Sequence, residues 1–268
     1  MKFLEAIRQG MPVPVPVIDT HTHLGEYALG GMHQAYKDMA AAIADAGAAG
    51  VDCVVTSPSP LSFGDMELTN AVTAELIQAF PGKVYGNLFL APHNGAKAVE
   101  KTIKKYASAR GFVGIKLLTG NHGTLHQPAF EPVWEFAESV QCPVACHMAS
   151  KSPGRETVVQ VLERHPDVKL LLSHLGGKKA DIPFYASLMK DSKVYLDTSG
   201  RMPTDFAEVV RLCGEDRLIF GSDFVTRDVR AEIGKIVISG VSDEALKKIF
   251  SENYLRLLED SRYGKIKL

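Results

Sequence analysis

Short runs rich in apolar and β-branched residues alternate along the chain with longer, periodic segments. The runs cover residues 15–20, 51–57, 83–91, 112–118, 143–148, 168–174, 193–199 and 217–223. Between them lie segments such as GAKAVEKTIKKYASA, in which apolar residues recur every three or four positions, as in an amphipathic helix. Strands that are apolar throughout and separated by helices indicate a parallel sheet buried on both faces.

The number of these runs favours a closed barrel. Eight runs in 268 residues give about one strand every 33 residues, enough for a strand, a helix and two short loops. We therefore predict a single-domain (β/α)8 TIM barrel, a fold of about 250 residues. An open, doubly wound parallel sheet is the alternative. No GxGxxG or P-loop pattern follows any run, which weakens the nucleotide-binding form of that alternative.

We expect one domain over residues 1–268, because no segment rich in Gly, Ser or Pro marks a boundary. Residues 1–14 are predicted to be an N-terminal extension ahead of the first strand. Residues 242–260 are predicted to form a closing helix, since Ser242 is a suitable N-cap and two acidic residues follow it in the first turn.

Polar residues gather at the carboxyl ends of the predicted strands. The first run ends in His21 and His23, whose spacing of two points both side chains to one face of the strand. Lys116, His147 and Asp223 lie in or at the ends of later runs, as does His174. Because the carboxyl ends of barrel strands meet on one face, we expect these side chains to converge.

Neutral imidazoles and a carboxylate suit a divalent transition metal. We predict one or two ions, most simply zinc, with manganese and nickel as alternatives. Asp19 has the same parity as the two histidines but lies deeper in the strand. We prefer to interpret it as a buried carboxylate hydrogen-bonded to backbone or to a ligand imidazole rather than as a direct ligand.

Lys116 is unusual because an ammonium group is costly to bury inside a strand. Three interpretations stay open. The side chain could snorkel or form an ion pair at the barrel rim. It could be carboxylated by carbon dioxide, giving a carbamate that bridges two metal ions, or it could hold an anionic group of the substrate.

The ordered set HTH, GIKL, ACHM, LLSHLGG and IFGSDF resembles the amidohydrolase superfamily of metal-dependent (β/α)8 barrels. SHLGG and FGSDF are most similar to its amidohydrolase-related (amidohydrolase 2) branch, which includes lactonases, hydratases and decarboxylases of the aminocarboxymuconate-semialdehyde type as well as hydrolases. The resemblance extends from residue 17 to the NYLRLL segment near residue 257.

The resemblance implies roles for the strand-end residues. His21, His23, His147 and Asp223 would hold one ion, and Asp223 would also shuttle a proton. His174 would bind a second ion or polarise the substrate. Two-metal members usually carry a carboxylated lysine at the position of Lys116, whereas mononuclear decarboxylases generally lack it, so the number of ions stays open.

Hydrolysis of an amide, lactone or other ester is the leading prediction. A bound ion would lower the pKa of its water from 15.7 towards about 7. Asp223 is placed to take that proton, and His174 to stabilise developing negative charge. The alternatives are decarboxylation or hydration at a mononuclear site, and a metal-bearing barrel that binds its ligand without turnover.

Charged residues in the loops after the strands are candidate contacts for a small-molecule substrate. They are His122, His126, Lys151, Arg155, Arg201 and Arg227. Lys151 and Arg155 lie beside a predicted helix N-terminus, a natural anion site, and several cations together favour an acidic substrate. The GEYALGGMHQAY loop after the first strand offers glycines and aromatic residues and is predicted to form an apolar lid.

Composition excludes some classes of binding partner. With a formal net charge of -1 and no basic block interleaved with aromatic residues, we expect no nucleic-acid partner. Without a signal-peptide core or an apolar run of about 18 residues, we expect no membrane association and a cytoplasmic location. The four cysteines form no CxxC pair and are predicted to lie in the core. If the protein is an oligomer, a homo-oligomer is expected on general frequency.

Overall fold

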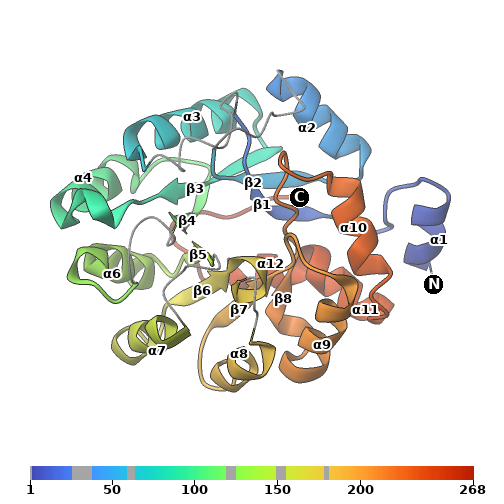
Figure 1. The fold of residues 1–268 in the computed structure, drawn as a ribbon. Coiled ribbons are helices and arrows are strands. Elements are labelled where there is room, and N and C mark those ends of the chain that lie inside the picture. Colours follow the sequence, from blue (N-terminus) through green and yellow to red (C-terminus); the bar gives the residue numbers. More distant parts are fainter. Residues whose placement is uncertain (1, 26–37, 59–63, 119–124, 149–154, 178–180) are drawn as a thin grey trace.

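Eight parallel strands form a barrel surrounded by helices in the computed structural model (Figure 1), which describes residues 2–25, 38–58, 64–118, 125–148, 155–177 and 181–268. The strand order follows the sequence, and each strand is parallel to the next. The strands are β1 (Ile18–Thr22), β2 (Cys53–Thr56), β3 (Val84–Phe89), β4 (Phe112–Leu118), β5 (Pro143–His147), β6 (Lys169–Leu172), β7 (Val194–Asp197) and β8 (Leu218–Ile219). The prediction of a (β/α)8 TIM barrel is therefore confirmed. An open doubly wound sheet would reverse its strand order at a switch point, so that alternative is wrong.

Two strands end earlier than their apolar runs. The run 168–174 forms a strand only as far as Leu172, and the run 217–223 only as far as Ile219. The backbone leaves the extended conformation because His174 and Asp223 have φ angles of 58° and 70°. Both candidate ligands therefore lie on irregular backbone just beyond a strand.

Helices cover the outside of the barrel (Figure 1). Aspartate side chains cap four of them by accepting a hydrogen bond from a first-turn amide: Asp38, Asp65, Asp181 and Asp228. The helices around the strands are α2 (Met39–Ala48), α3 (Met66–Ala79), α4 (Ala96–Tyr106), α6 (Glu131–Val140), α7 (Arg155–Arg164), α8 (Ile182–Leu188), α9 (Pro203–Cys213) and α10 (Val229–Val237). No described helix is long and apolar enough to cross a membrane.

The two ends of the chain add further helices. The N-terminal extension contains α1 (Lys2–Arg8), whose Phe3 ring stacks on Phe250 with centroids 6.2 Å apart. The Ser242 side chain caps α11 (Asp243–Lys247), which continues through a π-helical turn, Lys248–Glu252, into α12 (Asn253–Leu257). The closing segment is therefore helical over 243–257, shorter than the 242–260 expected.

The barrel interior forms its own apolar cluster, separate from the layer between strands and helices. It includes Ile18, Val113, Leu171 and Ile219 from the strands, together with Tyr254, Leu257, Leu258 and Ile266 from the closing helix and the tail. Cys53, Cys142 and Cys146 are buried and free, whereas Cys213 is only partly buried.

Candidate metal centre

The carboxyl end of β1 brings two imidazoles together. His21 and His23 are both nearly buried, and their Nε2 atoms lie 3.2 Å apart. Oδ1 of Asp223 lies 3.2 Å from the His23 Nε2 and 3.7 Å from the His21 Nε2. These three residues form a triad that could hold a metal ion.

A second triad shares His21 with the first. His147 is the last residue of β5, and its Nδ1 lies 3.3 Å from the Nε2 of His174. His21, His147 and His174 each offer a ligand atom, all within 4.8 Å of one another. The structure thus brings together five of the six candidate residues expected at the strand ends, in two groups that overlap at one histidine.

Acceptors behind three of the histidines fix their tautomers. Nδ1 of His21 lies 2.9 Å from a carboxylate oxygen of Asp197, and Nδ1 of His23 lies 2.7 Å from the Ser57 carbonyl. Nδ1 of His174 faces the Ser199 carbonyl at 3.1 Å. Since these partners only accept hydrogen bonds, each Nδ1 carries a proton and each Nε2 directs a lone pair towards the centre.

This donor set fits a cation. The Nε2 of His23 and Oδ1 of Asp223 are both acceptors at 3.2 Å, so a proton or a metal ion must lie between them. The Nε2 atoms of His21 and His23 lie 3.2 Å apart, close enough to share one ion. Imidazole and carboxylate donors in this number suit a divalent transition metal.

Electrostatics prepares the ligands for such an ion. Burial, reinforced by the nearby Lys116, lowers the pKa of His21 to about 4 and that of His147 to about 2. Burial alone would raise the pKa of Asp223, but the hydrogen bond with His23 and the neighbouring imidazoles hold it well below its usual range. At neutral pH the two histidines are neutral and the carboxylate is ionised, which are the forms that bind metals.

Lys116 lies inside the centre rather than at the rim. Its side chain, on β4, is 2% exposed, and Nζ lies 3.0 Å from the Nε2 of His21. Burial lowers the pKa of Lys116, although the carboxylates of Asp197 and Asp223 oppose the shift. The snorkelling interpretation is wrong because the side chain does not reach solvent. Carboxylation and the holding of an anionic group remain predictions.

Sequence reasoning missed Asp197 and Ser199 at the end of β7. The buried Asp197 carboxylate accepts hydrogen bonds from Nδ1 of His21, from the amide of His174 at 2.9 Å and from the Ser199 hydroxyl at 2.5 Å. Burial alone would raise the pKa of Asp197, but the charge and hydrogen bond of His21 keep it low. The signal was present, since the seventh run, KVYLDTS, ends in polar residues as the ligand-bearing runs do.

The structure describes only some of the candidate substrate contacts, and these have different partners. His122 and Lys151 lie outside the described residues, as do most of the predicted lid and the side chain of Arg155. Arg201 donates to Asp205 at 3.2 Å and to the Gly177 carbonyl at 3.1 Å. The Nε of Arg227 lies 3.3 Å from Oδ2 of Asp223, so the structure brings this arginine to the metal centre.

His126 lies between β4 and α6, with its ring partly exposed. Its carbonyl accepts a hydrogen bond from Arg164 at 2.9 Å, whereas its buried Nδ1 has no hydrogen-bond partner among the described residues. Nothing in these contacts links His126 to the metal centre.

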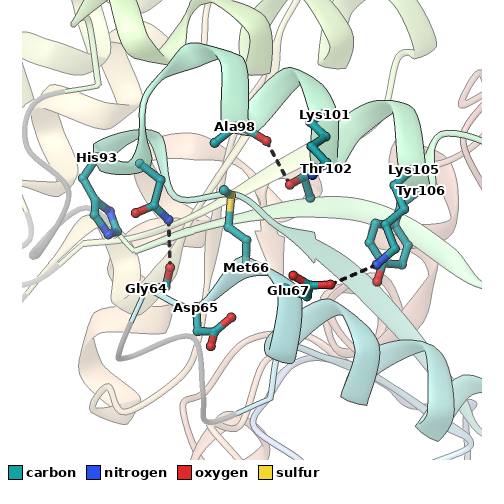
Figure 2. A pocket seen from close by; sticks show the side chains of 11 residues that line it. Gly64, Asp65, Met66, Glu67, His93, Ala98, Lys101, Thr102, Lys105 and Tyr106 are labelled. Carbon is teal, nitrogen blue, oxygen red and sulfur yellow. Dashed lines mark hydrogen bonds and ion pairs between the residues drawn. The ribbon is translucent and has the colours of Figure 1, made fainter.

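A surface groove of about 510 Å³ lies elsewhere, between the start of α3 and α4 (Figure 2). Its lining includes Asp65, Glu67, His93 and Lys105 and contains none of the candidate ligands. Glu67 and Lys105 form an ion pair across it at 3.7 Å (Figure 2). The convergent donors lie at the barrel mouth instead.

Several solved structures share this fold. A 2,6-dihydroxybenzoate decarboxylase from Rhizobium has 15% identity, with 91% of this chain and 99% of that chain covered and a TM-score of 0.72. A 5-carboxyvanillate decarboxylase from Sphingomonas paucimobilis has 14% identity, coverage of 92% and 100%, and a TM-score of 0.72. A dihydroxybenzoic acid decarboxylase from Polaromonas sp. JS666, with bound manganese and 2-nitroresorcinol, has 16% identity, coverage of 91% and 97%, and a TM-score of 0.65.

At these identities the structural likeness shows the fold alone. No curated protein matches the chain in sequence. The sequence model of one family, described as amidohydrolase, matches residues 18–259, which include every candidate ligand. Together with the strand-end ligands, this match shows that the chain belongs to the amidohydrolase family.

Proposed function

We propose that this chain is a divalent-metal-dependent hydrolase that cleaves an amide, lactone or other ester bond of a small molecule. The observation that carries the proposal is the pair of ligand triads sharing His21, with the Lys116 Nζ 3.0 Å from the shared imidazole. This arrangement offers donors for two ions and a buried amine beside the histidine that the two triads share. Two-metal sites of this kind are typical of hydrolytic enzymes.

When bound, the ion would supply Lewis acidity, which lowers the pKa of a coordinated water and polarises the substrate carbonyl. We assign the proton transfer to Asp223, which is ionised and has one oxygen directed at the histidines. It would accept the proton of the attacking water and deliver it to the leaving group.

We assign His174 to metal binding. Its Nδ1 faces the Ser199 carbonyl, so the proton lies on Nδ1 and Nε2 is a lone-pair donor. An imidazole in this tautomer has no Nε2 proton to offer a developing oxyanion. The contact therefore favours the ligand role over the substrate-polarising role.

We propose that Lys116 becomes carboxylated. Its lowered pKa increases the fraction of neutral amine, the form that adds carbon dioxide with loss of a proton. The product would be an anionic carbamate among the histidines, in place of a buried ammonium, and would carry two oxygen donors. Zinc is the ion we expect from the ligand types, and manganese is the main competitor.

Decarboxylation at a mononuclear site is the second candidate, favoured by the three decarboxylases that share the fold. Hydration belongs to the same alternative. The manganese in the Polaromonas structure gives the competing metal assignment. A small, acidic substrate, a cytoplasmic location and a homo-oligomer remain predictions from sequence.

Metal analysis and mass spectrometry distinguish the two-metal hydrolase from the mononuclear alternative. Two equivalents of metal and 44 Da of added mass on Lys116, the mass of carbon dioxide, are expected for the hydrolase; one equivalent on an unmodified lysine supports the mononuclear alternative. A panel of lactones, esters and amides would then be compared with hydroxybenzoates. Carbon dioxide release without ester or lactone cleavage would overturn hydrolysis, and binding without turnover across the panel would support a binding protein.

A further inference from the structure

Three of the candidate ligands lie on the two sides of the seam where the chain after β8 meets β1. His21 and His23 belong to the β1 side, and Asp223 follows β8. Backbone hydrogen bonds cross this seam from Thr20 to Phe220 at 3.1 Å and from Asp223 to His21 at 2.8 Å. The relative position of the three ligands therefore depends on how this seam is held.

A side chain replaces one rung of the seam. After the Thr20 to Phe220 bond, a regular parallel ladder would pair the Ser222 amide with a β1 carbonyl. The Ser222 amide instead donates to Oδ1 of Asp19 at 2.9 Å, and its hydroxyl donates to Oδ2 of the same carboxylate. Asp19 is 0% exposed, so this contact is buried.

The Asp19–Ser222 contact also binds two further backbone amides, one of His21 itself and one of the residue that follows Asp223. Oδ1 of Asp19 also accepts the His21 amide at 3.3 Å, and Oγ of Ser222 accepts the Phe224 amide at 3.0 Å. The backbone on each side of Asp223 is thus tied, directly or through Ser222, to the carboxylate that holds His21.

Asp223 needs such support. Its φ of 70° lies in the left-handed region, which is unfavourable for a residue with a side chain and persists only where the surroundings impose it. Gly221 permits the close approach of the strands, because a Cβ there would lie 2.7 Å from the Cβ of His21.

We propose that Asp19 and Ser222 form a seam brace, a positioning pair that sets the spacing of His21, His23 and Asp223 and so determines the affinity for a divalent ion. Neither residue needs to touch the ion or the substrate. The inference rests on the proposed metal-dependent function and deepens it by naming residues that act through the ligands.

A merely structural role would lower stability without changing metal affinity, so the test needs a matched control. Asn253 is also buried and hydrogen-bonds to β8, but at the strand's opposite end, where its Nδ2 donates to the Leu218 carbonyl at 2.8 Å. Asn253→Ala therefore removes a buried contact from the same strand far from the ligands.

The experiment measures Zn²⁺ and Mn²⁺ dissociation constants by competition with a chelating dye, starting from metal-free protein. Ser222→Ala and Asp19→Asn are each expected to raise the constant about 10- to 100-fold, as loss of a ligand's supporting contact does. The double variant should bind the ion about as tightly as whichever single variant binds it less tightly, because either substitution alone already removes the brace. Asn253→Ala should lower the melting temperature but keep wild-type affinity. Wild-type affinity in Ser222→Ala, or fully additive effects in the double variant, would overturn the proposal.

Hydrogen exchange of the metal-free protein separates this inference from the proposed function. Faster exchange at the Phe224 amide is expected in Ser222→Ala and not in Asn253→Ala, because Ser222 Oγ accepts that amide. Unchanged exchange there would overturn the brace whether or not an ion binds. A wild-type chain that binds neither ion would instead overturn the proposed function, and the exchange result would still decide on the brace.

Discussion

The two ends of the barrel use the same strands for opposite purposes. Towards the amino end, inward-facing residues such as Ile18, Val113 and Leu171 form an apolar cluster closed by Tyr254 and Leu257. Towards the carboxyl end, β1, β4 and β5, which also contribute to this cluster, present His21, Lys116 and His147. One end therefore supplies stability by burying apolar surface, and the other carries buried polar groups that only a well-supported structure can hold.

Backbone conformation divides the ends in the same way. The candidate ligands His174 and Asp223 have positive φ angles, beyond the strands that lead to them. Of the four described non-glycine residues with a positive φ, three lie just beyond the ends of β6 and β8, and none lies within a strand. These candidate ligands therefore lie on a backbone conformation that the surrounding structure must hold in place.

The largest effect at the carboxyl end of the barrel is expected from Asp223→Asn. Turnover should fall about 10²- to 10⁴-fold, the usual contribution of a general acid or base, because the amide cannot take a proton from water. Asparagine tolerates a positive φ, so the local backbone should persist. Steady-state kinetics measure the loss, and the melting temperature of the metal-free variant is the control. Unchanged turnover would remove Asp223 from proton transfer.

A change at the opposite end should affect stability alone. Leu257, 2% exposed, closes the inner cluster, so Leu257→Ala should lower the free energy of unfolding by about 2–5 kcal/mol through lost burial and a cavity. Denaturant unfolding measures this change. Metal affinity of the folded variant should match the wild type, and a large loss of affinity would show that the two ends are not separable.

The sequence anticipated the two ends unequally. Buried parallel strands are continuous apolar runs, so all eight strands were predictable, and a histidine or lysine at the end of such a run is conspicuous. Lys116 and His147 were found for this reason. The contact between Asp19 and Ser222 joins residues 203 positions apart, so no local sequence pattern predicts it. Nor does a local pattern predict the positive φ at Asp223, because aspartate adopts that conformation at only a minority of positions.

Acid should weaken the polar end before the apolar end. The pKa values of His21 and His147 in the folded protein, about 4 and about 2, lie below the 6.5 of a free histidine. Below pH 6.5 the unfolded chain therefore binds protons that the folded chain does not. Each histidine should cost the metal-free protein about 1.4 kcal/mol of unfolding free energy per pH unit as the pH falls from 6.5 towards the folded pKa.

Urea unfolding of metal-free protein at pH values from 7 down to 5 measures this slope. His21→Gln should reduce the slope by up to about 1.4 kcal/mol per pH unit, because that histidine no longer titrates, whereas Leu257→Ala should shift the curve without changing its slope. A slope that is the same in His21→Gln and wild type would contradict the assignment of His21 as a buried neutral imidazole.

The smallest expected effect concerns the rim of the polar end. Arg227 is half-exposed and contacts Asp223 through Nε at 3.3 Å, and solvent-exposed ion pairs contribute at most about 1 kcal/mol. Arg227→Gln should therefore raise the KM for a substrate bearing a carboxylate by no more than about five-fold, with little change for a neutral analogue. Arg230→Gln is the matched control, since that guanidinium is similarly exposed but is bound to Asp45 rather than to a candidate ligand, and its loss should not change KM for either substrate. Equal changes for the charged and neutral substrates in Arg227→Gln would mean that this arginine supports Asp223 alone and does not recognise an anionic group.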